Sequence, residues 1–169
     1  DLEKLKTKKG IEKAFSCAAL CNNSQISKED DGWQAIGDPT CSASATFGWK
    51  TIGSSEEYKK KYTRIHEFFF DADRKRMTTI NEIEGEKWVF TKGAFDPMED
   101  LITHIYEGDD IIKISDEHLA EIKEVNLSMA SGALRVLALA GKKINEETEI
   151  ENISEIESEL IFLGLIGIR

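Results

Sequence analysis

Residues 67–79 place a run of aromatic residues shortly before three consecutive cations, with three residues between the two groups. The segment reads EFFFDADRKRMTT, with Phe68, Phe69 and Phe70 followed by Arg74, Lys75 and Arg76. An aromatic ring can stack on a purine base, while ammonium and guanidinium groups pair with phosphates. The same pattern also fits a strand with Phe68 and Phe70 in the core, followed by a solvated basic turn. The segment alone therefore leaves a nucleotide site and a structural role both open.

Other groups of reactive residues give weaker signals. The chain has no G-x-x-x-x-G-K-[ST], G-x-G-x-x-G, H-E-x-x-H or C-x-x-C motif. Cys17 and Cys21 would share one helical face, but no further ligand lies nearby, so we interpret them as small buried hydrophobic residues. The three His are scattered and no Ser occupies a nucleophile elbow. We expect neither a catalytic residue nor a metal site in this chain.

The charge of the chain is acidic and unevenly spread. The net charge is −10, which argues against nucleic acid or an anionic membrane surface as the main partner. Seven Glu lie within residues 146–159 without any Lys or Arg, and without them the net charge would be −3. This segment lacks the alternating ligands and turn Gly of a calcium loop, so we expect it to be a solvated loop.

Length and composition favour a single folded domain. The chain has 169 residues, of which 40% are hydrophobic, enough for one substantial core. Its longest apolar run, 160–168, is well short of the ~20 residues of a membrane helix, so we expect no direct membrane contact. Three Cys favour reduced thiols in a cytosolic setting. The start at Asp1 without Met leads us to expect a piece of a longer protein.

Helices and strands must position these residues. Helical periodicity and capping residues predict helices over 9–20, from Pro39 to about 50 behind a cap at Asp38, from Ser54 or Ser55, over 96–106, and from a cap at Ser115 to about 129. Aromatic and β-branched runs predict strands over 64–70, 76–82, 87–92, 134–140 and 160–168. The second and third strands form an antiparallel hairpin through Glu84-Gly85-Glu86. A polar loop is expected between the first two helices.

Several sequence blocks, in order, resemble the nucleotide-binding (N) domain of cation-transporting P-type ATPases. They are Cys21-Asn22-Asn23-Ser24, Gly37-Asp38-Pro39-Thr40, Phe70-x-x-x-Arg74-Lys75-x-Met77-Thr78, Phe90-Thr91-Lys92-Gly93-Ala94, LRVLALA at 134–140 and FLGLIGI at 162–168. They span nearly the whole chain and are most similar to the bacterial calcium-pump branch. The resemblance implies an α+β fold, an antiparallel sheet flanked by helices, with residues 1–169 forming one nucleotide-binding domain of a larger membrane pump.

The resemblance also implies a binding site for ATP. Phe70 would stack on the adenine, and Lys75 would lie by the base and phosphates. Lys92 and Gly93 would line the floor of the pocket, and Arg135 would reach the phosphate chain. These assignments are consistent with the predicted sheet, because Lys92 ends one strand and Arg135 begins another.

The block that contains Thr40 departs from the family pattern at the next residue. Thr40 keeps its place, but Cys41 stands where the family usually has a Glu that helps to recognise the adenine amino group. A thiol is a weak hydrogen-bonding partner for an exocyclic amine. The resemblance therefore implies weaker or less discriminating ATP binding here.

In such a pump the domain would hold ATP and present its γ-phosphate to an Asp of a phosphorylation domain, which would also hold most of the Mg. The family's phosphorylated Asp and membrane ion ligands are absent from these residues, so the chain should bind nucleotide without turnover. The partners would be ATP and the phosphorylation and actuator domains of the same polypeptide, in a cytoplasmic part of an integral membrane protein. Calcium is the expected ion, and proton, magnesium and sodium or potassium pumps remain open alternatives.

Two other hypotheses remain open on the sequence. One is a protein-interaction or regulatory module, whose acidic segment binds a basic regulator beside a degenerate nucleotide pocket. The other is a free-standing soluble enzyme, for which these residues supply no complete catalytic set.

Overall fold

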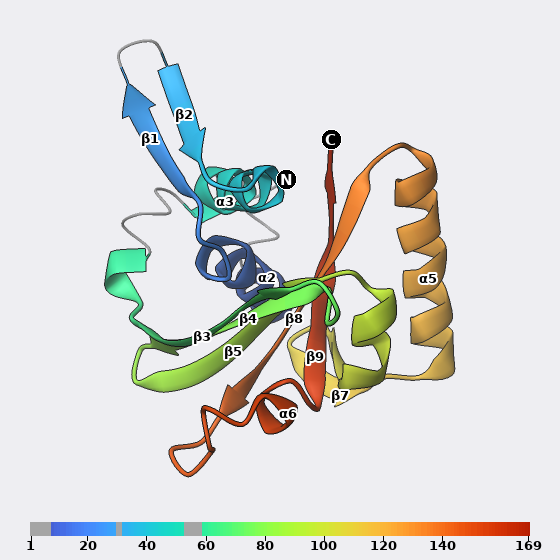
Figure 1. Cartoon of the computed structure of the whole chain (residues 1–169). Helices are drawn as coiled ribbons and strands as arrows, with labels where there is room; N and C mark the ends of the chain where they lie inside the picture. Colours follow the sequence, from blue (N-terminus) through green and yellow to red (C-terminus); the bar gives the residue numbers. More distant parts are fainter. Residues whose placement is uncertain (1–7, 30–31, 53–58) are drawn as a thin grey trace.

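The computed structural model describes residues 8–29, 32–52 and 59–169 (Figure 1). The helices are α2 (Lys9–Leu20), α3 (Pro39–Ile52), the 3-10 helix η1 (Asp96–Leu101), α5 (Asp116–Ser131) and α6 (Ile153–Ile156). The strands are β1 (Gln25–Glu29), β2 (Gly32–Ile36), β3 (Arg64–Asp71), β4 (Arg76–Ile83), β5 (Glu86–Gly93), β6 (Ile102–Glu107), β7 (Asp110–Lys113), β8 (Arg135–Ile144) and β9 (Leu160–Ile168). In this part of the chain no helix is long and apolar enough to cross a membrane.

Seven strands form one sheet in the order β3-β4-β5-β8-β9-β6-β7. Neighbouring strands are antiparallel except β6 and β9, which are parallel. The predicted α+β fold, an antiparallel sheet flanked by helices, is confirmed, and the structure adds one parallel pair, β6 with β9, that the sequence patterns did not reveal. The reason is that β6 and β9 lie far apart in the sequence, so their mutual direction is set by the path of the chain and not by a tight turn.

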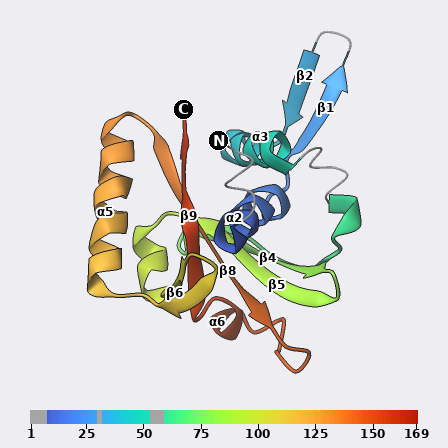
Figure 2. The ribbon, with the colours of Figure 1, turned by 180° about the vertical axis from the view of Figure 1, so that it is seen from behind.

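The two faces of the sheet carry separate hydrophobic cores. Val89 of β5 and Ala138 of β8 point to one core, while their neighbours Phe90 and Leu139 point to the other, as the alternation of side chains along a strand requires. Helix α2 covers the second face and α3 packs on α2. Helix α5 packs against β8 and β9 on the first face (Figures 1 and 2).

Most elements predicted from local patterns are confirmed. The helices expected over 9–20, from Pro39 and from the Ser115 cap are α2, α3 and α5, and the five expected strands are β3, β4, β5, β8 and β9. Ser115 caps α5 reciprocally: its hydroxyl accepts from the His118 amide, and the Ser115 amide donates to His118 Nδ1. The helix start expected at Ser54 or Ser55 lies outside the described residues.

Three segments differ from expectation. The polar loop expected after α2 contains the β1–β2 hairpin, which projects beside α3 and forms its own two-stranded sheet (Figure 1). The helix expected over 96–106 is the short 3-10 helix η1 followed by β6, because ITHIYE is rich in β-branched and aromatic residues that favour a strand over helix extension. Strand β7 was not predicted.

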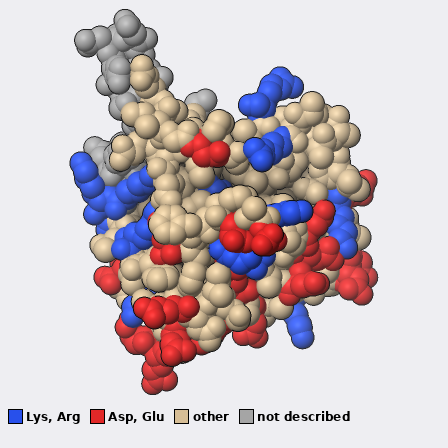
Figure 3. All heavy atoms as spheres, in the orientation of Figure 1, with Lys and Arg blue, Asp and Glu red and all other residues tan. Residues whose placement is uncertain are grey.

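The acidic segment 146–159 is only partly the solvated loop that we expected. Glu146 is exposed and pairs with Lys87, and acidic side chains gather along the lower edge of the molecule in Figure 3, where Figure 1 shows the β8–β9 connection. The segment also contains the short helix α6. Glu157, by contrast, is buried and paired with two Arg. A carboxylate is stable in such a place because opposite charges and hydrogen bonds compensate its desolvation.

Candidate functional site

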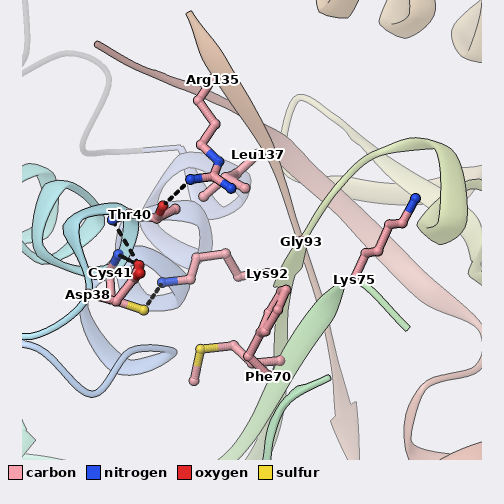
Figure 4. A pocket seen from close by; sticks show the side chains of 10 residues that line it. Asp38, Thr40, Cys41, Phe70, Lys75, Lys92, Gly93, Arg135 and Leu137 are labelled. Atoms are coloured by element: carbon pink, nitrogen blue, oxygen red, sulfur yellow. Dashed lines mark hydrogen bonds between the residues drawn. The ribbon is translucent and has the colours of Figure 1, made fainter. Parts of the chain in front are cut away.

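A pocket of about 280 Å³ opens at one edge of the sheet, against the first turn of α3 (Figure 4). Its lining residues are Asp38, Thr40, Cys41, Phe70, Lys75, Met77, Lys92, Gly93, Arg135 and Leu137. All the residues of the site expected from the sequence therefore lie together. The antiparallel topology explains this, because the ends of β3 and β5 and the starts of β4 and β8 fall on the same edge of the sheet.

The first turn of α3 forms one wall of the pocket. The Asp38 carboxylate caps the helix as predicted, and its Oδ1 accepts from the amides of Thr40 at 2.9 Å and Cys41 at 3.1 Å. Pro39 occupies the first helical position, where its missing N–H costs nothing. The Asp-Pro-Thr block thus fixes the backbone from which the Thr40 and Cys41 side chains face the pocket.

Two cations meet this wall from the sheet (Figure 4). Lys92 is only 4% exposed, and its Nζ lies 3.6 Å from Cys41 Sγ. Arg135 is exposed at the start of β8, and its Nη1 donates to Thr40 Oγ1 at 2.9 Å. Both side chains cross the pocket from neighbouring strands. The pocket therefore places two positive charges at the amino end of a helix, an arrangement that attracts an anion.

Phe70 forms an apolar platform at the mouth of the pocket. It is 65% exposed, whereas Phe68 packs against the core. The register of β3 against β4 shifts between Phe68 and Asp71, so the side chains at the end of β3 escape the strict alternation of a regular strand. The two interpretations of the aromatic run are thus resolved residue by residue: Phe68 is structural, and Phe70 faces the pocket.

The three consecutive cations that follow Phe70 separate in the structure. Lys75 lines the rim of the pocket, and its side chain extends away from Lys92 and Arg135 in Figure 4. Arg74 and Arg76 form ion pairs with Glu157 instead. The sequence pattern did not reveal this buried carboxylate, because Glu157 is one of seven similar Glu; its position just before the apolar run at 160–168 is the one signal that it is buried.

Gly93 permits a close approach between β5 and the turn that carries Lys75. A Cβ atom at Gly93 would lie 2.5 Å from both the Lys75 carbonyl oxygen and Arg76 Cβ. In addition, the Ala94 amide donates to that Lys75 oxygen at 3.1 Å. The absence of a side chain at Gly93 therefore shapes the pocket rim.

We expect Gly93→Ala to lower the free energy of unfolding by about 1–3 kcal/mol, because the backbone of the turn must move. In a chain of this length that corresponds to roughly 2–4 °C in Tm per kcal/mol, measurable by thermal denaturation. Gly132→Ala is the control, since its Cβ would meet its nearest atom at 3.3 Å. Equal losses of Tm in the two variants would contradict this account of Gly93.

The three thiols occupy two different environments. Cys17 and Cys21 are fully buried between α2 and the sheet. Their thiols point to backbone carbonyls, Cys17 to Thr91 at 3.6 Å and Cys21 to Phe90 at 3.4 Å. This confirms their interpretation as small core residues, and burial raises the pKa of the Cys17 thiol. Cys41 is partly exposed in the pocket.

We therefore expect one thiol of the native chain to react rapidly with an aromatic disulfide reagent, and the other two only after unfolding. The rapid reaction should be absent from Cys41→Ser. The number of thiols released with and without denaturant is read from the absorbance of the product. Two or more fast thiols in the native chain would show that the α2 interface is open.

The fold and this pocket define the class to which the chain belongs. The family described as P-type ATPase, cytoplasmic domain N, matches residues 10–169, and the chain belongs to this family. The chain is 37% identical to a calcium-transporting ATPase of Bacillus subtilis, over 95% of the chain and 18% of that protein. It is 32% identical to calcium-transporting ATPase 1 of Lactococcus lactis, over 89% of the chain and 17% of that protein.

A more distant relative is named for other ions. The chain is 29% identical to the sodium/potassium exporting P-type ATPase 1 of Saccharomyces cerevisiae, over 94% of the chain and 18% of that protein. The chain thus spans less than a fifth of the length of these relatives. The resemblance drawn from the sequence blocks is confirmed.

Proposed function

We propose that residues 1–169 form the ATP-binding domain of a P-type cation-transporting ATPase. The domain holds MgATP and presents the γ-phosphate to an Asp on a phosphorylation domain of the same polypeptide, which drives ion transport. The observation that carries the proposal is the pocket itself, which combines an exposed Phe70 ring with the Lys92 and Arg135 cations beside a helix amino terminus.

The chemistry of the pocket suits each part of a nucleotide. The Phe70 ring offers a face for adenine stacking, and Lys75 lies at the same rim for the base and phosphates. Lys92 and Arg135 supply charge-assisted donors for the phosphate chain. Gly93 lines the pocket, and its lack of a side chain lets the turn that carries Lys75 lie close to β5. Thr40 and Cys41 complete the opposite wall.

The division of labour follows from the chemistry of phosphoryl transfer. That reaction depends mainly on holding the transferred group in line with its charge neutralised. This domain supplies the binding surface for adenine and part of the positive charge, while the phosphorylation domain supplies the Asp and most of the Mg coordination. Turnover therefore belongs to the full-length ATPase, and the chain alone binds without hydrolysis.

Calcium is the ion that we propose, because the relatives from B. subtilis and L. lactis are named calcium-transporting ATPases. Ion selection itself belongs to membrane segments of the full-length protein. The domain then works on the cytoplasmic side of the membrane, and its partners are the phosphorylation and actuator domains. Neither nucleic acid nor the bilayer is a partner of this chain in the proposal.

An NMR titration of the isotope-labelled chain with MgATP tests the proposal. We expect the largest chemical-shift changes at Phe70, Lys92 and Arg135, with smaller ones at Lys75. An unchanged spectrum at millimolar MgATP, or changes confined to residues outside the pocket, would refute it.

A regulatory module with a degenerate pocket is the second candidate, and Cys41 is the observation that favours it. Its sulfur is the atom that meets Lys92, in a position where a thiol is a weak partner for an adenine amine. A thermal denaturation with and without millimolar ATP separates the two candidates. Stabilisation by ATP supports the ATP-binding domain, whereas an unchanged Tm together with binding of a basic peptide to residues 146–159 supports the module.

A further inference from the structure

Glu157 is a buried carboxylate on the opposite side of the sheet from the pocket. It is 3% exposed, and its Oε1 accepts from Thr78 Oγ1 at 2.7 Å. Thr78 and Thr91 are cross-strand partners that share one face, whereas Met77 and Lys92 are the next such pair and face the pocket. Because neighbouring residues on a strand point to opposite faces, Glu157 does not reach the pocket itself.

The same carboxylate holds two guanidinium groups of the turn between β3 and β4. Arg76 Nε donates to Glu157 Oε2 at 2.7 Å, and Arg74 Nη1 donates to Oε1. Arg74 also donates through Nη2 to the Phe69 carbonyl at 2.9 Å, at the end of β3. The buried carboxylate therefore connects the segment before β9 to both ends of the turn.

The turn has a conformation that needs such support. Lys75 adopts a left-handed φ of +52°, which costs a residue with a side chain about 1–2 kcal/mol. Its amide donates to the Asp71 carbonyl at 2.7 Å, and its own carbonyl accepts from the Ala94 amide. Arg76 packs closely against Gly93, where a Cβ atom would collide with Arg76 Cβ.

We infer that Glu157 is a positioning residue for the proposed nucleotide site. Its carboxylate fixes the turn 71–76 so that Phe70 and Lys75 stand at the pocket rim, and it keeps Arg74 and Arg76 out of the pocket. The inference rests on the proposed function, because it assigns Glu157 a part in nucleotide affinity. Through Glu157, the acidic segment 146–159 is linked to the turn that carries Lys75, and so to the proposed nucleotide site.

Removing this carboxylate has opposite consequences under two explanations. If Glu157 acted only as a negative charge near the pocket, Glu157→Gln would strengthen ATP binding through Coulomb's law and leave adenosine binding unchanged. If Glu157 positions the turn, the NH2 group of the introduced Gln faces the N–H groups of the Arg side chains, and a donor cannot pair with a donor. The turn then loses hydrogen bonds and loosens, and both ATP and adenosine bind more weakly. Adenosine matters here because it carries the base without phosphates.

We test this by calorimetric titration of Glu157→Gln with MgATP and with adenosine, well below its Tm. We expect Kd for both ligands to rise about tenfold, the range typical of coupling within one hydrogen-bond network. The amides of Lys75 and Ala94 should also exchange faster in NMR. Glu151→Gln removes the same charge from an exposed position of the segment and should leave both Kd values within about twofold.

Unchanged or tighter binding of both ligands to Glu157→Gln would overturn the inference. Should that variant fail to fold, Arg74→Ala removes the more exposed side of the network, and unchanged adenosine binding in it would have the same meaning. If the unmodified chain binds neither ligand, the proposed function itself fails. In that case, unchanged exchange of the Lys75 amide in Glu157→Gln would still refute the positioning of the turn.

Discussion

Replacement of Phe70 by Ala is expected to weaken ATP binding by about tenfold to a hundredfold, because stacking of a base on an aromatic ring contributes about 1–3 kcal/mol. The Phe70 side chain is 65% exposed, so little core packing is lost and the Tm should change by no more than about 2 °C. Affinity is measured by calorimetric titration, and stability by thermal denaturation of the same samples.

Phe69 provides a matched control for Phe70. It precedes Phe70 on β3 and is 70% exposed, yet the pocket is not lined by it. Phe69→Ala removes the same surface area and should leave the Kd for ATP within about twofold. Equal weakening in the two variants would mean that the end of β3 acts as an unspecific apolar patch, and equal affinity of Phe70→Ala and the unmodified chain would remove Phe70 from the site.

Replacement of Lys92 by Met is expected to stabilise the fold while it weakens ATP binding. In the described part of the chain no carboxylate pairs with the buried Lys92 ammonium, and its contact is the thiol of Cys41. Desolvation of a poorly paired charge costs free energy, which Met avoids at similar volume. We expect the free energy of unfolding to rise by about 1 kcal/mol, or roughly 2–4 °C in Tm.

The same substitution removes a charge-assisted donor of about 1.5–3 kcal/mol from the proposed phosphate path. The Kd for ATP should therefore rise by at least about tenfold. Lys143→Met is the control, because Lys143 is an exposed cation of β8 outside the pocket that pairs with Glu86. It should lower the Tm slightly or not at all and leave the affinity for ATP unchanged. A destabilised Lys92→Met would show that the ammonium is better paired than its contacts indicate.

The elements predicted correctly are those whose turns, helix caps and strand-forming residues lie within the element itself or directly beside it. Strands β4 and β5 are rich in β-branched and aromatic residues on either side of the short Glu84-Gly85 turn, and α3 begins with the Asp38-Pro39 cap, so each carries its own boundary. The β1–β2 hairpin was missed because its strand sequences, QISKE and GWQAI, are short and contain few of the β-branched and aromatic residues that mark a strand. Asp96-Pro97 correctly marked the start of η1, but it gave no signal for where that helix ends, and β6 was therefore predicted as helix.

The candidate site was predictable as a set of residues but not as a geometry. The sequence blocks supplied the lining residues, whereas the exposure of Phe70 depends on a register shift between β3 and β4. The fate of Arg74 and Arg76 depends on Glu157, which lies more than 80 residues further along the chain. Such pairings arise from the path of the chain through the sheet, and no local pattern encodes them.

The contacts of Arg135 with Thr40 and of Lys92 with Cys41 have a consequence for any anion that enters the pocket. The Thr40 hydroxyl and the Cys41 thiol compete with an incoming phosphate, since each accepts from one N–H of Arg135 or Lys92 that the phosphate could use. The affinity then depends on the difference between two sets of contacts, because an anion that takes these two donors gains less than it would from free ones, while the remaining N–H donors of the guanidinium and the ammonium stay available to it. The wall of the pocket therefore lowers the affinity for an anion, and shortening Thr40 is a route to tighter binding that adds no new donor.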